Sequence, residues 1–128
     1  MTSPADFARA PHARARGAQA EDRAVRWLAA QGYRVVERNL VTAAGELDAV
    51  AWDGDVLCFI EIKARASAQA GSALDAVDPR KQRRLGRAAS LYLARLRGEP
   101  ACRFDVLALD LDGGAWAFTL VRDAFQLG

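Results

Sequence analysis

Residues 45–65 read GELDAVAWDGDVLCFIEIKAR, two runs rich in alternating apolar residues on either side of Asp53-Gly54. An Asp-Gly pair between two such runs is a strong short-range signal for a β-hairpin. The stretch therefore predicts antiparallel strands over residues 45–53 and 55–64, joined by a two-residue turn at Asp53-Gly54.

The predicted register brings several charged residues of this hairpin together. Pairing Trp52 with Asp55 places Asp48 opposite Phe59, and Glu46 opposite Glu61. Opposed residues share a face of the sheet, and faces alternate along each strand. One side then carries Glu46, Asp48, Glu61 and Lys63. The other is an apolar core face of Leu47, Ala49, Ala51, Val56, Cys58, Ile60 and Ile62.

Carboxylates gathered in this way are costly unless a cation lies between them. Like charges opposed on a sheet destabilise it by up to about 1 kcal/mol, and a bound divalent cation reverses that sign. Mg²⁺ prefers one or two carboxylates with waters and phosphate oxygens, which Asp48 and Glu61 can provide, with the Ile62 carbonyl as a third protein ligand. Lys63, on the same face, could orient a water or stabilise a phosphate's growing charge.

The rest of the chain predicts one α/β domain. Apolar spacing indicates a helix over residues 17–31, and Asp78-Pro79 is a good N-cap and first turn for a helix that runs to Leu96. Further strands are expected at 33–40, 102–111 and 115–121, with a weakly helical loop over 65–77. The order α-β-β-β-α-β-β suits an antiparallel meander followed by a crossover helix and a parallel fourth strand.

Length and composition limit the class of protein. The chain of 128 residues is long enough for a single packed domain, which we assign to residues 17–128. Residues 1–16 are expected to form a flexible tail that lacks the apolar segment of a secretory signal. A cytoplasmic location is expected because that segment is missing, and no apolar run is long enough to span a membrane. Cys58 and Cys102 are expected to be buried free thiols and not zinc ligands, and His12 lies in the tail.

Both predicted helices carry notable charges. Glu21 falls on the inward stripe of the first helix, where a carboxylate is usually paired or bound to metal. Lys81 falls on the inward stripe of the second helix. The segment 80–97 contains seven basic residues and no acidic one. Arg80, Arg83, Arg84 and Arg87 spread outward toward possible backbone phosphates, although a charged, solvated helix face is the simpler alternative.

At this point the residues resemble a known family. Asp48, a gap, and then Glu61-Ile62-Lys63 within an αβββαβ core look like the D…(D/E)-x-K pattern of the restriction-endonuclease-like nuclease superfamily. The chain resembles in particular the bacterial UPF0102 family, also called YraN-like, which is similar to archaeal Holliday-junction resolvases. The matching stretches are Gly17 to Glu21, Asn39, 45–48, 61–65, Lys81, 103–105 and Ala124-Phe125.

The resemblance implies a restriction-endonuclease-like fold with a mixed central sheet flanked by helices. It implies a nuclease that hydrolyses phosphodiester bonds in DNA with Mg²⁺ (or Mn²⁺), branched DNA being one candidate substrate. Asp48, Glu61 and Lys63 would be the catalytic core, and Glu21 a further metal or water ligand. The proposed nucleic-acid contacts are Arg65, Lys81, Arg80 and Arg84, and the supporting residues are Glu46, Asn39, Arg103 and Asp105.

Several alternatives stay open. Glu61 and Lys63 could form an ordinary salt bridge on a solvated sheet face, and Glu46 could serve the metal's surroundings or bond to a neighbouring strand. Arg103 and Asp105 are expected to pair with each other or to brace the site. The competing function is a nucleic-acid-binding module that keeps the fold without turnover, and a third reading is a purely structural domain. Cutting two strands symmetrically suits two sites, which leaves a homodimer open.

Overall fold

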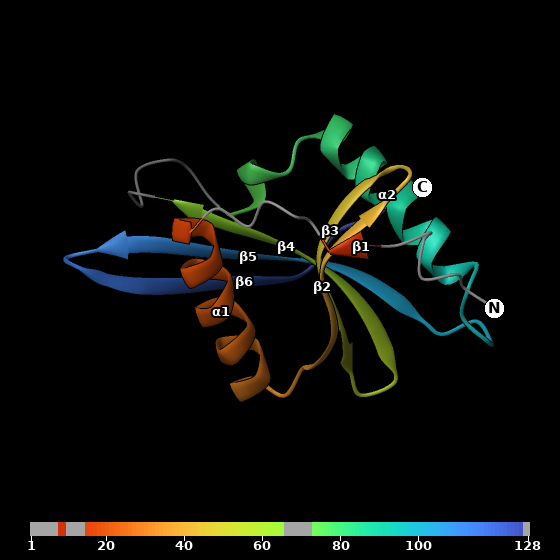
Figure 1. The fold of residues 1–128 in the computed structure, drawn as a ribbon, viewed down its shortest axis with the longest axis horizontal. Coiled ribbons are helices and arrows are strands. Elements are labelled where there is room, and N and C mark those ends of the chain that lie inside the picture. The colour runs from red at the N-terminus through yellow and green to blue at the C-terminus, as the bar shows by residue number, and fades with distance from the viewer. Residues whose placement is uncertain (1–7, 10–14, 66–72, 127–128) are drawn as a thin grey trace.

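The computed structural model describes residues 8–9, 15–65 and 73–126, and its centre is a six-stranded sheet (Figure 1). The elements are β1 (Ala8–Arg9), α1 (Ala15–Ala30), β2 (Arg34–Thr42), β3 (Gly45–Asp53), β4 (Val56–Arg65), the 3₁₀ turn η3 (Leu74–Ala76), α2 (Pro79–Leu93), β5 (Cys102–Asp112) and β6 (Ala115–Phe125). The predicted α/β class is confirmed.

The strands follow the sheet in sequence order, from β1 to β6. β2, β3 and β4 form the predicted antiparallel meander, and β4 pairs with β5 in parallel after the crossover through α2. A bulge between Phe104 and Val106, with Asp123 at φ +52°, lets the antiparallel β5–β6 pairing continue to Phe125. The last strand is therefore longer than the predicted 115–121.

The second helix begins where the sequence predicted. The Asp78 carboxylate accepts a hydrogen bond of 2.8 Å from the Lys81 backbone N–H, and Pro79 occupies the first helical position. The helix ends at Leu93 and not at Leu96, because the chain turns just before Gly98, which has φ +84°. The N-cap therefore defines the start of α2 as the sequence predicted.

The predicted hairpin is present, but its register is wrong by two residues. Phe59 lies opposite Val50, and Val56 lies opposite Asp53, so the turn is Gly54-Asp55. Gly54 has φ +59°, and glycine is the residue that takes a positive φ at the first turn position without strain. A shift of two leaves the alternation unchanged over the paired residues 49–53 and 56–60. Continuing the ladder one step beyond Ala49 and Ile60 sets Asp48 across from Glu61, and not across from Phe59.

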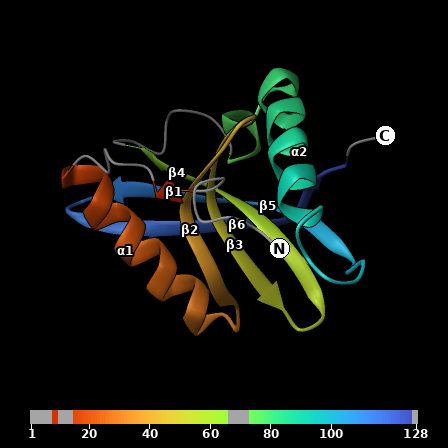
Figure 2. The same ribbon diagram turned by 45° about the vertical axis from the view of Figure 1, so that its right-hand side comes forward.

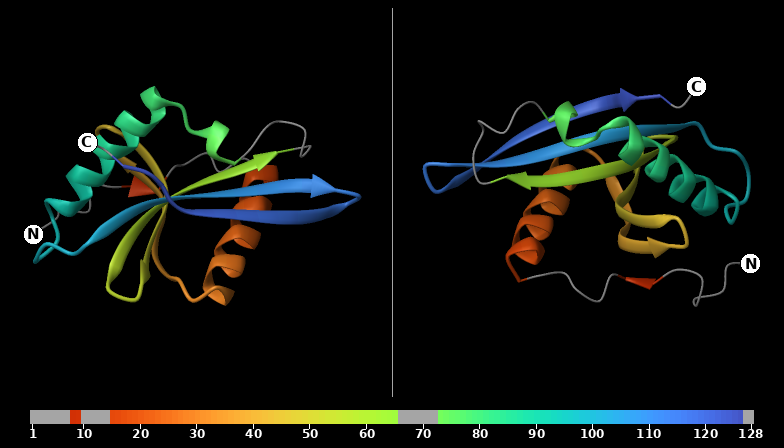
Figure 3. Two further views of the ribbon diagram at one scale, coloured as in Figure 1. Left: turned by 180° about the vertical axis from the view of Figure 1, so that it is seen from behind. Right: turned by 90° about the horizontal axis from the view of Figure 1, so that it is seen from above.

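One helix packs on each face of the sheet (Figures 2 and 3). Ala20, Ala24 and Leu28 of α1 pack with Cys58 and Ile60 on one face. On the other face, α2 contributes Leu85, Ala88 and Ala89, which pack with Val50, Leu57 and Phe59. Leu47 belongs to this second cluster, contrary to the prediction that it shares a face with Ala49. Glu61 and Lys63 follow Phe59 on the α2 side.

Some predictions concern the chain's periphery. Of the proposed tail, the structure describes Ala8–Arg9, which pair with Val41 and Leu40, and the first turn of α1. His12 and residues 66–72 of the predicted loop lie outside the described residues. Cys58 is buried as expected, whereas Cys102 is exposed at the start of β5, so that prediction is wrong. No helix in the described part of the chain is long and apolar enough to cross a membrane.

Candidate active site

The candidate site lies where β3 and β4 part. Their ladder ends at Ala49 opposite Ile60, although β3 begins at Gly45 and β4 continues to Arg65. Beyond that point β3 stays with β2 and β4 stays with β5, and the two strands separate in Figure 1. The separation leaves backbone groups of β4 available to side chains of β3. The Ile62 N–H donates a hydrogen bond of 2.8 Å to Asp48 Oδ2.

Asp48 and Glu61 form a pair of carboxyl groups in this gap. Glu61 is buried, with 8% of its side chain exposed. Burial is the main cause that raises the pKa of Asp48 well above its ordinary 3.8. The negative charge of Glu61 raises this pKa further, and the hydrogen bond from Ile62 opposes the rise. Burial and the neighbouring charge of Glu61 thus disfavour the ionised form of Asp48.

Two further acidic residues border the pair. Burial, and then the charges of Glu21 and Glu61, raise the pKa of Glu46, while Arg84 lowers it. Glu21 of α1 accepts a hydrogen bond of 2.6 Å from Asn39 Nδ2. Asn39 has φ +52°, a left-handed conformation that asparagine tolerates better than most residues. Glu21 and Asn39, predicted separately, are therefore direct partners at the border of the site.

The two lysines of the chain occupy different positions at the site. Lys81 Nζ of α2 lies 2.8 Å from Glu61 Oε1, with 26% of the lysine side chain exposed. Lys63 is exposed and makes no ion pair with any carboxylate in the described part of the chain. The sequence assigned Lys81 to nucleic-acid contact and did not predict its pairing with Glu61. Its position on the inward stripe of α2, facing the strand that carries Glu61, was the available signal.

The donor set suits a small hard cation. Asp48 and Glu61 offer carboxylate oxygens, and Mg²⁺ is commonly held by one or two carboxylates with waters and substrate phosphate oxygens. Within residues 8–9, 15–65 and 73–126, no three acidic, histidine or cysteine side chains are grouped closely enough to hold a metal ion. A cation here would therefore take two carboxylates, and would share Glu61 with the ammonium of Lys81.

Arg65 ends β4 and is bound to the neighbouring strand. Its Nε and Nη2 lie 2.6 and 3.0 Å from the two carboxylate oxygens of Asp110. Both side chains are almost buried, with 9% and 8% exposed. This bidentate ion pair ties β4 to β5 just beyond Lys63. Arg65, predicted to contact a phosphate, thus holds β4, the strand that carries Glu61, against β5.

Arg103 and Asp105 pair with each other, as one of the sequence interpretations expected. Arg103 Nε and Nη2 lie 2.8 and 3.0 Å from the Asp105 carboxylate, and Asp53 accepts a further bond of 2.9 Å. The Tyr33 hydroxyl donates a bond of 2.8 Å to Asp105. Burial, and then Asp105, raise the pKa of Tyr33 to about 12. Sequence reasoning missed Tyr33, which joins this network at the hairpin end of the sheet, away from Lys63.

The arginines of α2 point in different directions. Arg84 lies against Gly45, where an added Cβ would come within 3.2 Å of Arg84 Cδ. Gly45 has φ +136°, so this close approach and the backbone conformation both favour glycine. Arg80, Arg83 and Arg87 are exposed. Of the arginines predicted to contact nucleic acid, Arg84 is close enough to Glu46 for its charge to lower the pKa of that carboxyl, and Arg80 lies in the first turn of α2.

Comparison with known proteins identifies relatives along most of the chain. A family described as "Uncharacterised protein family UPF0102" matches residues 20–109. A UPF0102 protein of Magnetococcus marinus is 45% identical over 114 residues, covering 88% of this chain and 92% of the relative. One from Symbiobacterium thermophilum is 45% identical over 112 residues, covering 86% and 95%. One from Chlorobaculum parvum is 50% identical over 95 residues, covering 73% of each chain.

Proposed function

The chain belongs to the UPF0102 family, and from that premise we propose that it is a Mg²⁺- or Mn²⁺-dependent nuclease that hydrolyses phosphodiester bonds in DNA. One observation carries the proposal: Asp48 and Glu61 are held together where β3 and β4 part, with Lys63 two residues farther along β4. Keeping two carboxyl groups this close costs stability in the absence of a cation. A divalent ion bound by the two carboxylates would offset this cost.

Each residue of the site has a separate task in this proposal. Mg²⁺, when bound by Asp48 and Glu61, supplies Lewis-acid activation of the phosphate. The exposed ammonium of Lys63 orients the attacking water or stabilises the charge that grows on the phosphate oxygens. Arg84 and Arg80 hold phosphates of the DNA backbone. Glu21, which is positioned by its hydrogen bond from Asn39, can bind a water molecule or a metal ion at the border of the site.

A second candidate function is a nucleic-acid-binding module of the same fold without turnover. Two observations favour it. The carboxylate of Glu61 is already paired with Lys81, and the described residues include no group of three metal-ligating side chains. In that case Lys81 would replace the metal as the permanent counter-ion of Glu61. Either function concerns nucleic acid, and we propose a cytoplasmic location for both.

The two functions are separated by a metal-binding measurement followed by a cleavage assay. Mn²⁺ is titrated calorimetrically into the wild type and into Asp48→Asn/Glu61→Gln, first alone and then with DNA present. The same proteins are incubated with end-labelled single-stranded, duplex, flapped and branched DNA. Asp112→Asn is the control, because it removes an exposed carboxylate on β5. Heat and cleavage that vanish only in the double variant support the nuclease. DNA binding without metal binding or cleavage supports the module.

A further inference from the structure

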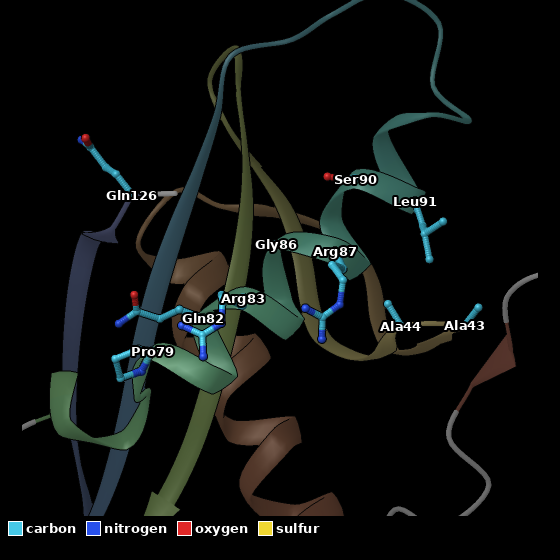
Figure 4. Close-up of a pocket in the computed structure, with 10 residues that line it drawn as sticks. All are labelled: Ala43, Ala44, Pro79, Gln82, Arg83, Gly86, Arg87, Ser90, Leu91 and Gln126. Atoms are coloured by element: carbon cyan, nitrogen blue, oxygen red, sulfur yellow. The ribbon is translucent and has the colours of Figure 1, made fainter. Parts of the chain in front are cut away.

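A groove runs along the outer side of α2, and it is not part of the carboxylate site (Figure 4). Its volume is about 1020 Å³. One wall is α2, which contributes Arg83, Gly86, Arg87 and Leu91, and the other is the turn between β2 and β3, at Ala43 and Ala44. We call this feature the α2 groove. None of the residues that line it is acidic.

The two arginines of the α2 groove are a cationic pair on one helix face. Arg83 and Arg87 are four residues apart, so their side chains are neighbours, and both are exposed. Like charges at this spacing destabilise a helix by a few tenths of a kcal/mol. Within the part of the chain that the structure describes, neither arginine has an ion-pair partner. An anionic ligand that contacts both would remove the repulsion.

The residues that line the rest of the groove are uncharged, and several of them have small side chains. Gly86, between the two arginines in sequence, also lines the groove and adds no side chain or charge to it. Ala43, Ala44 and Leu91 offer apolar surface beside the two cations. This combination suits a chain of phosphates that also carries exposed sugars and bases, which is the composition of an unpaired nucleic-acid strand.

The α2 groove leads toward the carboxylate site. Ala44 is followed by Gly45, on which Arg84 packs, and then by Glu46 and Asp48. The turn itself is braced by Thr42, whose Oγ1 donates a bond of 2.6 Å to the Gly45 carbonyl and accepts one of 3.1 Å from the Ala44 N–H. A strand seated in the groove would thus lie beside a fixed wall that continues directly into the acidic residues.

We propose that the α2 groove binds one unpaired DNA strand, with consecutive phosphates on Arg83 and Arg87, and directs that strand toward Asp48 and Glu61. This inference rests on the proposed function, and it names the form of the substrate: DNA with a single-stranded segment next to the scissile phosphate. A duplex keeps the faces of its bases stacked inside, whereas an unpaired strand exposes them to the apolar wall of Ala43, Ala44 and Leu91.

The test is the salt dependence of DNA binding, measured without metal so that cleavage cannot occur. Fluorescence anisotropy follows a labelled oligothymidylate strand, between about 50 and 200 mM salt. Each phosphate neutralised on a single strand contributes about 0.7 to the slope of log K against log salt. Arg83→Gln/Arg87→Gln is therefore expected to lower that slope by about 1.4. The matched control is Arg34→Gln/Arg97→Gln, which removes two exposed arginines elsewhere.

Each outcome decides the matter. A lower slope in the groove variant, with the control unchanged and both variants melting like the wild type, supports the groove. If the slope for the groove variant is unchanged while the wild type binds DNA normally, the proposal that the groove binds a strand is refuted and the nuclease proposal is unaffected. An equal loss on a matched duplex overturns the preference for an unpaired strand. A wild type that binds no DNA at all overturns the groove, and it also removes the substrate of the proposed nuclease, which the cleavage assay would then show independently.

Discussion

The ionisation of Asp48 should make the stability of the metal-free protein fall as pH rises. The pKa of Asp48 is raised well above its ordinary 3.8, first by burial and then by Glu61. Above pH 3.8 the unfolded chain releases this proton while the folded chain retains it. Stability is therefore lost by up to about 1.4 kcal/mol for each pH unit, until Asp48 ionises in the folded state as well. The loss accumulates from the ordinary pKa of 3.8 up to the pKa of Asp48 in the folded protein and is constant above it.

Asp48→Asn should remove this part of the pH dependence. The amide has the shape of the protonated acid, and its oxygen can still accept the hydrogen bond from the Ile62 N–H. The variant and the wild type should have similar stability near pH 4, and the variant should be the more stable protein at pH 6.5. Glu46, whose pKa is also raised, leaves a smaller slope in both proteins.

Urea denaturation with EDTA present, repeated along this pH series, measures the difference. Asp112→Asn is the matched control, since it makes the same chemical change at an exposed position. Parallel pH profiles for the wild type and Asp48→Asn would refute the reasoning, because they would show that Asp48 ionises alike in the folded and unfolded chains. Repeating the series with Mn²⁺ adds a second check, since a bound cation should stabilise the wild type and reverse its slope.

Three other substitutions test separate parts of the structure. Lys81→Met removes the ammonium that shares Glu61; calorimetry should show Mn²⁺ binding several-fold tighter, while the metal-free protein loses about 1–3 kcal/mol by urea denaturation. Weaker Mn²⁺ binding would mean that Lys81 assists the metal. Asp105→Asn breaks the buried pair with Arg103 and should cost about 3–5 kcal/mol in the same assay; a loss below 1 would contradict that role. Asp78→Ala removes the N-cap of α2 and should cost about 1 kcal/mol, with no change expected in Mn²⁺ affinity.

The strands and their faces were predictable because period-two alternation is a local property. The limits of β3 agree with the predicted 45–53, and the parallel β4–β5 pair follows from the crossover helix between them. The register was not predictable to the residue. Asp53-Gly54 and Gly54-Asp55 are both acceptable two-residue turns, and the choice depends on which position takes a positive φ. Because the actual register differs from the predicted one by an even number of residues, the prediction that Asp48 and Glu61 share a face was not affected.

The partners of the charged residues were harder to predict, because they come from other elements. Lys81 was expected to face inward, but its bond to Glu61 depends on how α2 lies across the sheet. Tyr33 gave no signal at all, since a tyrosine that begins a strand is ordinary, and its partner Asp105 is seventy-two residues away. Composition can show that a charge will need a partner. The packing of the elements decides which partner it finds.

The parting of β3 and β4 explains why the acidic residues are tolerated at this place. In a continuous ladder the Ile62 N–H would be available only to a strand carbonyl, and Asp48 would face Glu61 without any donor to stabilise it. Because the ladder stops at Ala49 and Ile60, that N–H binds Asp48 instead. Glu61, the next residue of β4, instead pairs with Lys81 of α2. The alternating pattern in the sequence runs through this point without interruption, so it predicts the residues of the site but not the place where the two strands part.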